Sequence, residues 1–183
     1  DIATVTVGAH AYYWTIAEFV EDELLPFLFA DAEDERQQYT MVIHNVAARL
    51  KSEGKRAGDD GMWSVDGEVI RTFGELVDFI CDRVEFEDTR EHWAGRAVTT
   101  GTVNAFTRRL RSAQRPLGHL IRADVAEPAL HQIRTSDAKV TVVDLHNLHD
   151  RAKRFVVGVT IRRAFDEKEA SGLARPLLFL VLD

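Results

Sequence analysis

The chain has 183 residues, a formal net charge of −7, 45% hydrophobic residues and 29% charged residues, a composition typical of a soluble globular protein. No apolar run approaches the roughly 20 residues that cross a bilayer, and no signal peptide opens the chain, so we expect no membrane contact and a cytoplasmic location. The single cysteine, Cys81, excludes an internal disulfide. Because it lies on an apolar helical face, we expect it to be buried rather than nucleophilic.

The first third of the chain is acidic and is expected to contain a strand and a helix. Residues 1–35 hold nine acids and no lysine or arginine, which argues against a general DNA-coating surface. Residues 3–9 alternate like a short strand. Thr15 and Glu18 then match a capping box, in which each side chain satisfies a free backbone N–H at a helix start. Pro26 is expected to interrupt or restart this helix.

A long amphipathic helix is expected from Asp31 to Gly54. Acids crowd its first turn, where they interact favourably with the helix dipole. One apolar stripe should face the core, and it consists of Tyr39, Val42, Ile43, Val46 and Leu50.

The next stretch predicts a small hairpin and a further helix. Residues 63–65 and 68–70 flank a turn of the Asp-Gly type and are expected to pair. A second capping box, formed by Thr72 and Glu75, then opens a helix whose apolar spacing continues to Val84.

Arginines cluster in the middle of the chain. Between residues 92 and 123 there are six arginines and no acid. A helix is expected over residues 102–114, with Arg108, Arg109 and Arg111 outside its apolar face. These three are candidate contacts to phosphate, either of DNA or of a nucleotide on a neighbouring subunit, because the guanidinium group fits phosphate oxygens. The alternative is a solvated face whose arginines pair with the acidic first third of the chain.

Two apolar runs joined by one helix end the chain. Residues 140–145 and 177–182 are rich in apolar residues, and residues 150–170 have a helical pattern. We expect a right-handed β-α-β unit with both strands buried in a parallel sheet, which makes the fold class α/β. Asp183 would follow the second strand at the edge where such sheets bind ligands. An acid in that place is the pattern of a Walker B strand, whose Asp holds the Mg²⁺ of a bound nucleotide.

The same segment resembles a known family. The order VTVVDLHNLHDRAKRFVVGVTIRRAF, a short polar linker and then RPLLFLVLD is similar to the segment that leads into Walker B in the HerA/FtsK-like ATPases, to which VirB4-type conjugation ATPases are related. The resemblance covers residues 139–183 well and extends loosely over the helical region before them. It implies part of a parallel RecA-like P-loop ATPase sheet with a mostly helical insertion subdomain. It also implies an ATP- and Mg²⁺-dependent motor in which Asp183 is the catalytic, metal-binding acid.

The resemblance carries further implications for partners and organisation. Asp144, in the loop after the first of these strands, would lie on the nucleotide side of the sheet. The intact protein would be a homo-oligomeric ring, expected to be a hexamer, that moves double-stranded DNA in a helicase-like manner, with a nuclease as an accessory partner. Residues 1–14 would be an N-terminal strand segment, residues 15–136 the helical insertion, and residues 137–183 the β-α-β unit of the ATPase core.

The chain departs from the family pattern in two places. No G-x-x-x-x-G-K-[ST] motif is present: Gly54-Lys55 is followed by Arg56, and Arg49 stands where the first glycine belongs. In the family a second acid follows the Walker B Asp, whereas this sequence ends at Asp183. We therefore expect an internal fragment of a longer ATPase, which by itself does not hydrolyse ATP.

Two other functions are open at this point. A non-enzymatic helical protein-interaction module would dock partners on its acidic and arginine-rich faces and would leave the last strand structural. A metal-dependent hydrolase would use His146 and His149, which are three residues apart near two acids. The ordinary explanation of this stretch is that Asp144 and Asn147 lie in a turn and that His149 or Asp150 begins the helix.

Overall fold

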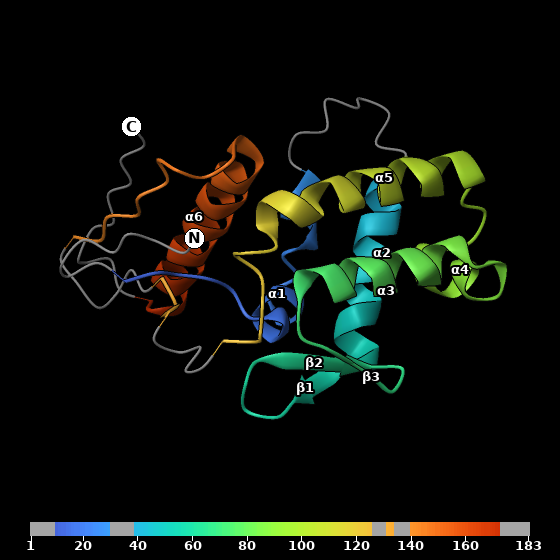
Figure 1. The fold of residues 1–183 in the computed structure, drawn as a ribbon, viewed down its shortest axis with the longest axis horizontal. Coiled ribbons are helices and arrows are strands. Elements are labelled where there is room, and N and C mark those ends of the chain that lie inside the picture. The colour runs from blue at the N-terminus through green and yellow to red at the C-terminus, as the bar shows by residue number, and fades with distance from the viewer. Residues whose placement is uncertain (1–9, 30–38, 126–130, 134–139, 173–183) are drawn as a thin grey trace.

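The described part of the chain is mostly helical (Figure 1). The computed structural model describes residues 10–29, 39–125, 131–133 and 140–172. Within these ranges the elements are α1 (Ile16–Glu21), the 3₁₀ helix η1 (Leu25–Phe29), α2 (Thr40–Glu53), β1 (Lys55–Ala57), β2 (Met62–Val65), β3 (Glu68–Ile70), α3 (Phe73–Glu85), α4 (Glu87–Ala94), α5 (Thr100–Leu117) and α6 (Asp150–Ala170). None of the described helices is long and apolar enough to cross a membrane.

The helices pack around one hydrophobic cluster. Helix α3 packs against α4 and α5, α2 packs against α4, and α6 packs against η1 and α5. The strands form an antiparallel sheet in the order β1-β2-β3, which lies at one end of α2 (Figure 1). The buried cluster extends from Trp14 to Val159 on α6. Helix α6 therefore shares its core with the helices that precede it in the chain.

Both predicted capping boxes are confirmed. At the start of α1, the Thr15 N–H donates to the Glu18 carboxylate over 2.9 Å, and the Glu18 N–H donates to the Thr15 hydroxyl over 3.0 Å. Thr72 and Glu75 form the same pair at α3. Glu18 is buried, and its carboxylate also accepts hydrogen bonds from the Thr15 hydroxyl and the Gln132 amide. These donors offset the cost of burying its charge.

The hairpin follows the sequence prediction, whereas α2 begins at Thr40, with Tyr39 as its N-cap, rather than at Asp31. The expected apolar stripe is buried: Tyr39, Val42, Ile43, Val46 and Leu50. Gly54 ends the helix, and the chain then forms β1, which the sequence analysis did not predict. β2 and β3 pair as expected, with Val65 opposite Glu68. The Trp63 indole N–H donates to the Leu50 carbonyl over 2.9 Å, so the hairpin satisfies a carbonyl in the last turn of α2.

The predicted helix over residues 150–170 is confirmed as α6. Phe155 on this helix is fully buried, with its ring centroid 5.3 Å from Trp14 in an edge-to-face contact and 6.3 Å from Phe19 in a stacked contact. Such pairs add to the stabilisation from apolar burial. Gly158 allows η1 to approach closely, because a Cβ at this position would lie 2.8 Å from the Phe27 ring. These contacts fix α6 against the first described elements of the chain.

The predicted α/β fold class is wrong. The structure is mostly helical, and its small sheet is antiparallel rather than a parallel RecA-like sheet. Residues 140–145, predicted to be a buried strand, form no strand, and Val140 and Val142 are 77% and 85% exposed. The other two predicted strands, residues 3–9 and 177–182, lie outside the described residues.

The error has a physical reason. An apolar β-branched run forms a buried strand only where a neighbouring strand pairs with its backbone and other elements cover its faces. Residues 140–145 take part in no strand pairing, and of their side chains Val143 and Leu145 pack partly against the core. The sequence pattern of residues 140–145 indicates β propensity but gives no information about a partner strand. It therefore predicted a strand that these residues do not form.

Replacing glycine in the turn before β2 tests how the sheet packs on α1. Gly61 and Gly67 have φ angles of +72° and +79°, so alanine at either position costs about 1–2 kcal/mol of backbone strain. A Cβ on Gly61 would also lie 2.5 Å from the Thr15 side chain, whereas one on Gly67 would meet nothing within 4 Å. We expect denaturant titration to show a loss of unfolding free energy of about 2–4 kcal/mol for Gly61→Ala and about 1–2 kcal/mol for Gly67→Ala. Equal losses would contradict this packing.

Candidate functional site

Of the two acids predicted to bind nucleotide and metal, one is described. Asp183 lies outside the described residues, and Asp144 lies in the loop before α6. The Asp144 carboxylate accepts a hydrogen bond from the His146 N–H over 2.8 Å, which closes a local turn. Burial, and then the negative charge of Asp144, raise the pKa of the Tyr12 hydroxyl to about 12. Asp144 is therefore an exposed turn residue close to Tyr12.

The two histidines of this loop do not form a metal site with the described residues. Both His146 and His149 are exposed. His149 is the N-cap of α6, where its Nδ1 accepts a hydrogen bond from the Arg151 N–H over 3.1 Å. Within the described ranges no group of three or more His, Cys, Asp or Glu side chains is placed to hold a metal ion. The interpretation of His149 as a helix start is confirmed.

The Gly54-Lys55 pair has the wrong structural setting for a phosphate-binding loop. A P-loop leads from a strand into a helix, and the free N–H groups of the helix start bind the phosphates. Gly54 instead follows the last residue of α2, and Lys55 begins β1. The nearby helix end exposes carbonyl groups and the negative end of the dipole, which repel phosphate.

The arginines of α5 lie on two different faces of the helix. Arg108, Arg111 and Arg115 are exposed, and their i, i+3, i+7 spacing places them along one face; we call this set the arginine stripe. Arg109 is half-buried, and its guanidinium lies 4.9 Å from the centre of the Tyr39 ring. Of the three candidate contacts from the sequence, the structure thus groups Arg108 with Arg111 and places Arg109 on another side.

The charge partners of these arginines differ from the sequence expectation. Arg111 pairs with Glu85 of α3 over 3.1 Å. The two flanking arginines, Arg96 and Arg122, pair with Glu91 and Asp124, each over 2.7 Å. None of these acids belongs to the acidic first third of the chain. Within the described residues, Arg108 and Arg115 have no ion-pair partner.

Helix α6 meets α5 beside the stripe. Arg151, in the first turn of α6, donates to the Ser112 hydroxyl and, over 3.4 Å, to the Arg109 carbonyl. Phe155, one turn further on, enters the core. The start of α6 is therefore held on α5, and a fourth guanidinium lies at the border of the stripe.

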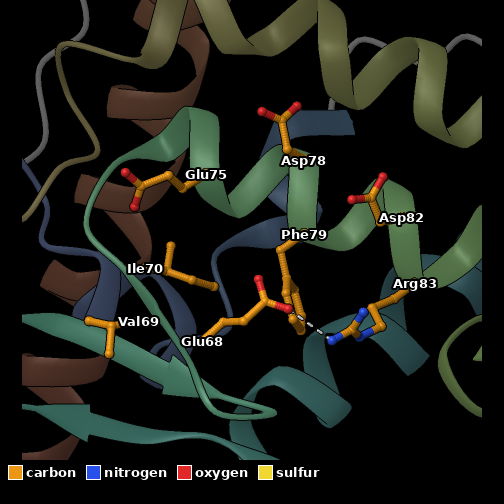
Figure 2. A pocket seen from close by; sticks show the side chains of 8 residues that line it. All are labelled: Glu68, Val69, Ile70, Glu75, Asp78, Phe79, Asp82 and Arg83. Atoms are coloured by element: carbon orange, nitrogen blue, oxygen red, sulfur yellow. Dashed lines mark hydrogen bonds and ion pairs between the residues drawn. The ribbon is translucent and has the colours of Figure 1, made fainter.

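A second surface feature, which we call the β3–α3 groove, is an open groove of about 240 Å³ (Figure 2). Its lining consists of Glu68, Val69, Ile70, Glu75, Asp78, Phe79, Asp82 and Arg83. Figure 2 shows Glu68 reaching Arg83, and the pair is 3.0 Å apart. Arg83 also pairs with Asp66 over 2.9 Å and lies 4.6 Å from the Phe79 ring centre. The groove combines an apolar floor with an acidic rim.

Two features of the site were missed by the sequence analysis. Arg115 was counted in the cluster but not among the candidate contacts, although its spacing from Arg108 and Arg111 already placed it on their face. The β3–α3 groove brings a strand and a helix together, and no pattern within either segment signals it. Helical spacing was sufficient for the first feature, whereas the second required the tertiary contact between β3 and α3.

Comparison with known proteins gives no assignment: no protein-family model and no curated protein matches the chain. The arginine stripe and the β3–α3 groove are therefore interpreted from their own geometry. The stripe is an exposed helix face and the groove is open to solvent. Open surfaces of this kind suit macromolecular partners better than small molecules, which bind in concave, largely enclosed sites.

The reactivity of Cys81 tests whether α3 is packed tightly against α5, the helix that carries the stripe. Cys81 is fully buried on α3, as the sequence predicted, and burial raises the pKa of its thiol to about 11. We expect native protein to resist iodoacetamide at about pH 8 and denatured protein to react completely, because the exposed thiolate is the nucleophile. Mass spectrometry reports the alkylated fraction. Rapid alkylation of the native protein would contradict the packing of α3 on α5.

Proposed function

We propose that the chain is part of an ATP-hydrolysing DNA translocase of the HerA/FtsK-like class. The observation that carries this proposal is the sequence of residues 139–183, in which a helix is followed by a short linker and an apolar run that ends at Asp183. Helix α6 occupies residues 150–170, the place that the resemblance gives to the helix before the Walker B acid, and so supports the proposal. The proposal concerns the activity and does not include the parallel sheet.

The chemistry assigned to this chain is metal binding by Asp183. Mg²⁺ needs only one or two protein carboxylates, because it keeps several waters and takes further ligands from the substrate phosphates. Bound Mg²⁺ would neutralise charge on those phosphates. Asp144 is the second acid in the proposal, and as an exposed carboxylate it has the hard oxygen atoms that this ion prefers. The phosphate-binding lysine and the acid that orients the attacking water would lie outside these 183 residues.

The proposed partners follow from the same resemblance. The intact ATPase would act in the cytoplasm as a ring of identical subunits, with six as the expected number, and would move double-stranded DNA with a nuclease as an accessory partner. The described helices α1 to α5 would form the helical insertion beside the nucleotide site. Their shared core with α6 supports this placement, because Phe155 joins α6 to Trp14 and Phe19.

The β3–α3 groove favours a second candidate function, a non-enzymatic protein-interaction module. Glu75, Asp78 and Asp82 line the groove besides the Glu68–Arg83 pair, so its rim holds more negative than positive charge. A partner segment with lysine or arginine would complement this charge. In this case the apolar run before Asp183 would have a structural role only.

ATP hydrolysis distinguishes the two functions. The assay uses a longer ATPase that carries this chain together with a P-loop, with and without duplex DNA. We expect DNA to stimulate hydrolysis and Asp183→Asn to reduce it on the order of a hundredfold or more, because the variant loses a charged ligand of the catalytic metal. This chain alone should be inactive.

The matched control is Asp166→Asn, which makes the same chemical change on an exposed part of α6, where Asp166 lies 3.6 Å from Arg162. Its hydrolysis rate should equal that of the wild type. No hydrolysis by the wild type, or equal rates for Asp183→Asn and Asp166→Asn, would refute the ATPase and leave the interaction module as the working function.

A further inference from the structure

The arginine stripe is an exposed ridge of positive charge on an acidic chain. Arg108, Arg111 and Arg115 follow one another along α5, and seven residues of α-helix separate the ends of the stripe by about 10 Å. The chain as a whole carries −7, so this concentration of positive charge is not part of a generally basic surface. We propose that the stripe is the surface by which this chain contacts the phosphate backbone of duplex DNA.

The availability of the guanidinium groups supports a phosphate partner. Arg108 and Arg115 have no ion-pair partner among the described residues, and Arg111 has a single one, Glu85, with the Arg111 side chain 51% exposed. An exposed pair of this kind contributes little to stability. Arg111 can therefore exchange Glu85 for a phosphate at small cost.

The residues of α5 favour a duplex backbone over unpaired bases. Proteins that bind single strands combine basic residues with exposed aromatic rings on which the bases stack. The one aromatic residue of α5 is Phe106, which is fully buried. Among the residues beside the stripe, Asn104 is exposed, and its side-chain amide can donate to phosphate oxygens. The exposed side chains of α5 thus suit contact with phosphates and include no aromatic ring on which an unpaired base could stack.

This inference rests on the proposed function for its substrate, DNA, and it adds the residues that make the contact. Each phosphate neutralised by an arginine lowers the slope of log binding constant against log salt by about 0.9. With all three arginines in contact the predicted slope is about −2.7, and with two of them removed the predicted slope is about −0.9. The salt dependence therefore counts the contacts and does not depend on any measurement of ATP hydrolysis.

The experiment measures binding of this chain to a fluorescein-labelled DNA duplex by fluorescence anisotropy over a salt series. The test variant is Arg108→Ala/Arg115→Ala. The control is Arg49→Ala/Arg96→Ala, which removes the same charge from two arginines outside α5 that pair with Glu53 and Glu91. We expect the wild type and the control to share the steeper slope and the test variant to show the shallower one, with circular dichroism unchanged in all three.

Three results would overturn the inference. These are no duplex binding by the wild type, equal loss of slope in both double variants, and stronger binding to a single strand than to the duplex. The outcome is separate from that of the proposed function. If duplex binding depends on the stripe but hydrolysis is unchanged by Asp183→Asn, only the proposed ATPase is refuted. If hydrolysis depends on Asp183 but duplex binding does not depend on the stripe, only the inference about the stripe is refuted.

Discussion

The burial of Trp14 is the interaction on which the described structure depends. Its indole ring packs edge-to-face on Phe155 of α6, 5.3 Å between centroids. Its backbone N–H donates to the Leu120 carbonyl over 2.6 Å, and its carbonyl accepts from the Arg122 N–H over 2.9 Å. One residue therefore joins the start of the described chain, the segment after α5 and helix α6. Removing a buried tryptophan ring typically costs about 3–5 kcal/mol, a large part of the stability of a domain.

This junction explains why the arginine stripe faces solvent. The chain that leaves α5 is tied to Trp14, and α6 packs on another side of α5 through Arg151. Helix α3 covers a third side, where Arg111 meets Glu85. The apolar residues of α5 fill the space that these neighbours enclose, so the polar face is left outward. The sequence of α5 decides which residues are polar, and the contacts of its neighbours decide where that face lies.

The sequence predicted those parts of the fold that depend on contacts close in the chain. The capping boxes at Thr15 and Thr72 and the hairpin around Asp66 each need partners only a few residues away, and all of them were confirmed. The strand expected at residues 140–145 needed a partner strand distant in sequence, and the apolar pattern contained no information about one. In the candidate site, the sequence analysis grouped Arg108, Arg109 and Arg111 outside the apolar face, and helical spacing places Arg108 and Arg111 on one side of α5. The contact of Arg109 with Tyr39 crosses from α5 to the residue before α2, and it could not be read from either segment alone.

The two proposed roles, phosphate contact by the stripe and metal binding by Asp183, place different physical demands on the chain. A phosphate-binding ridge works at long range: arginines on a regular helix attract a polyanion without exact placement, and the interaction tolerates exposure. A metal-binding carboxylate instead has to be held within a fraction of an ångström by a rigid support. The described helices provide the regular ridge directly. For the proposed metal-binding carboxylate they provide α6, which precedes it in the sequence and is anchored in the core by Phe155. If both proposals hold, a change in the stripe would alter DNA contact without altering the support of the acid, because the two roles fall on separate parts of the chain.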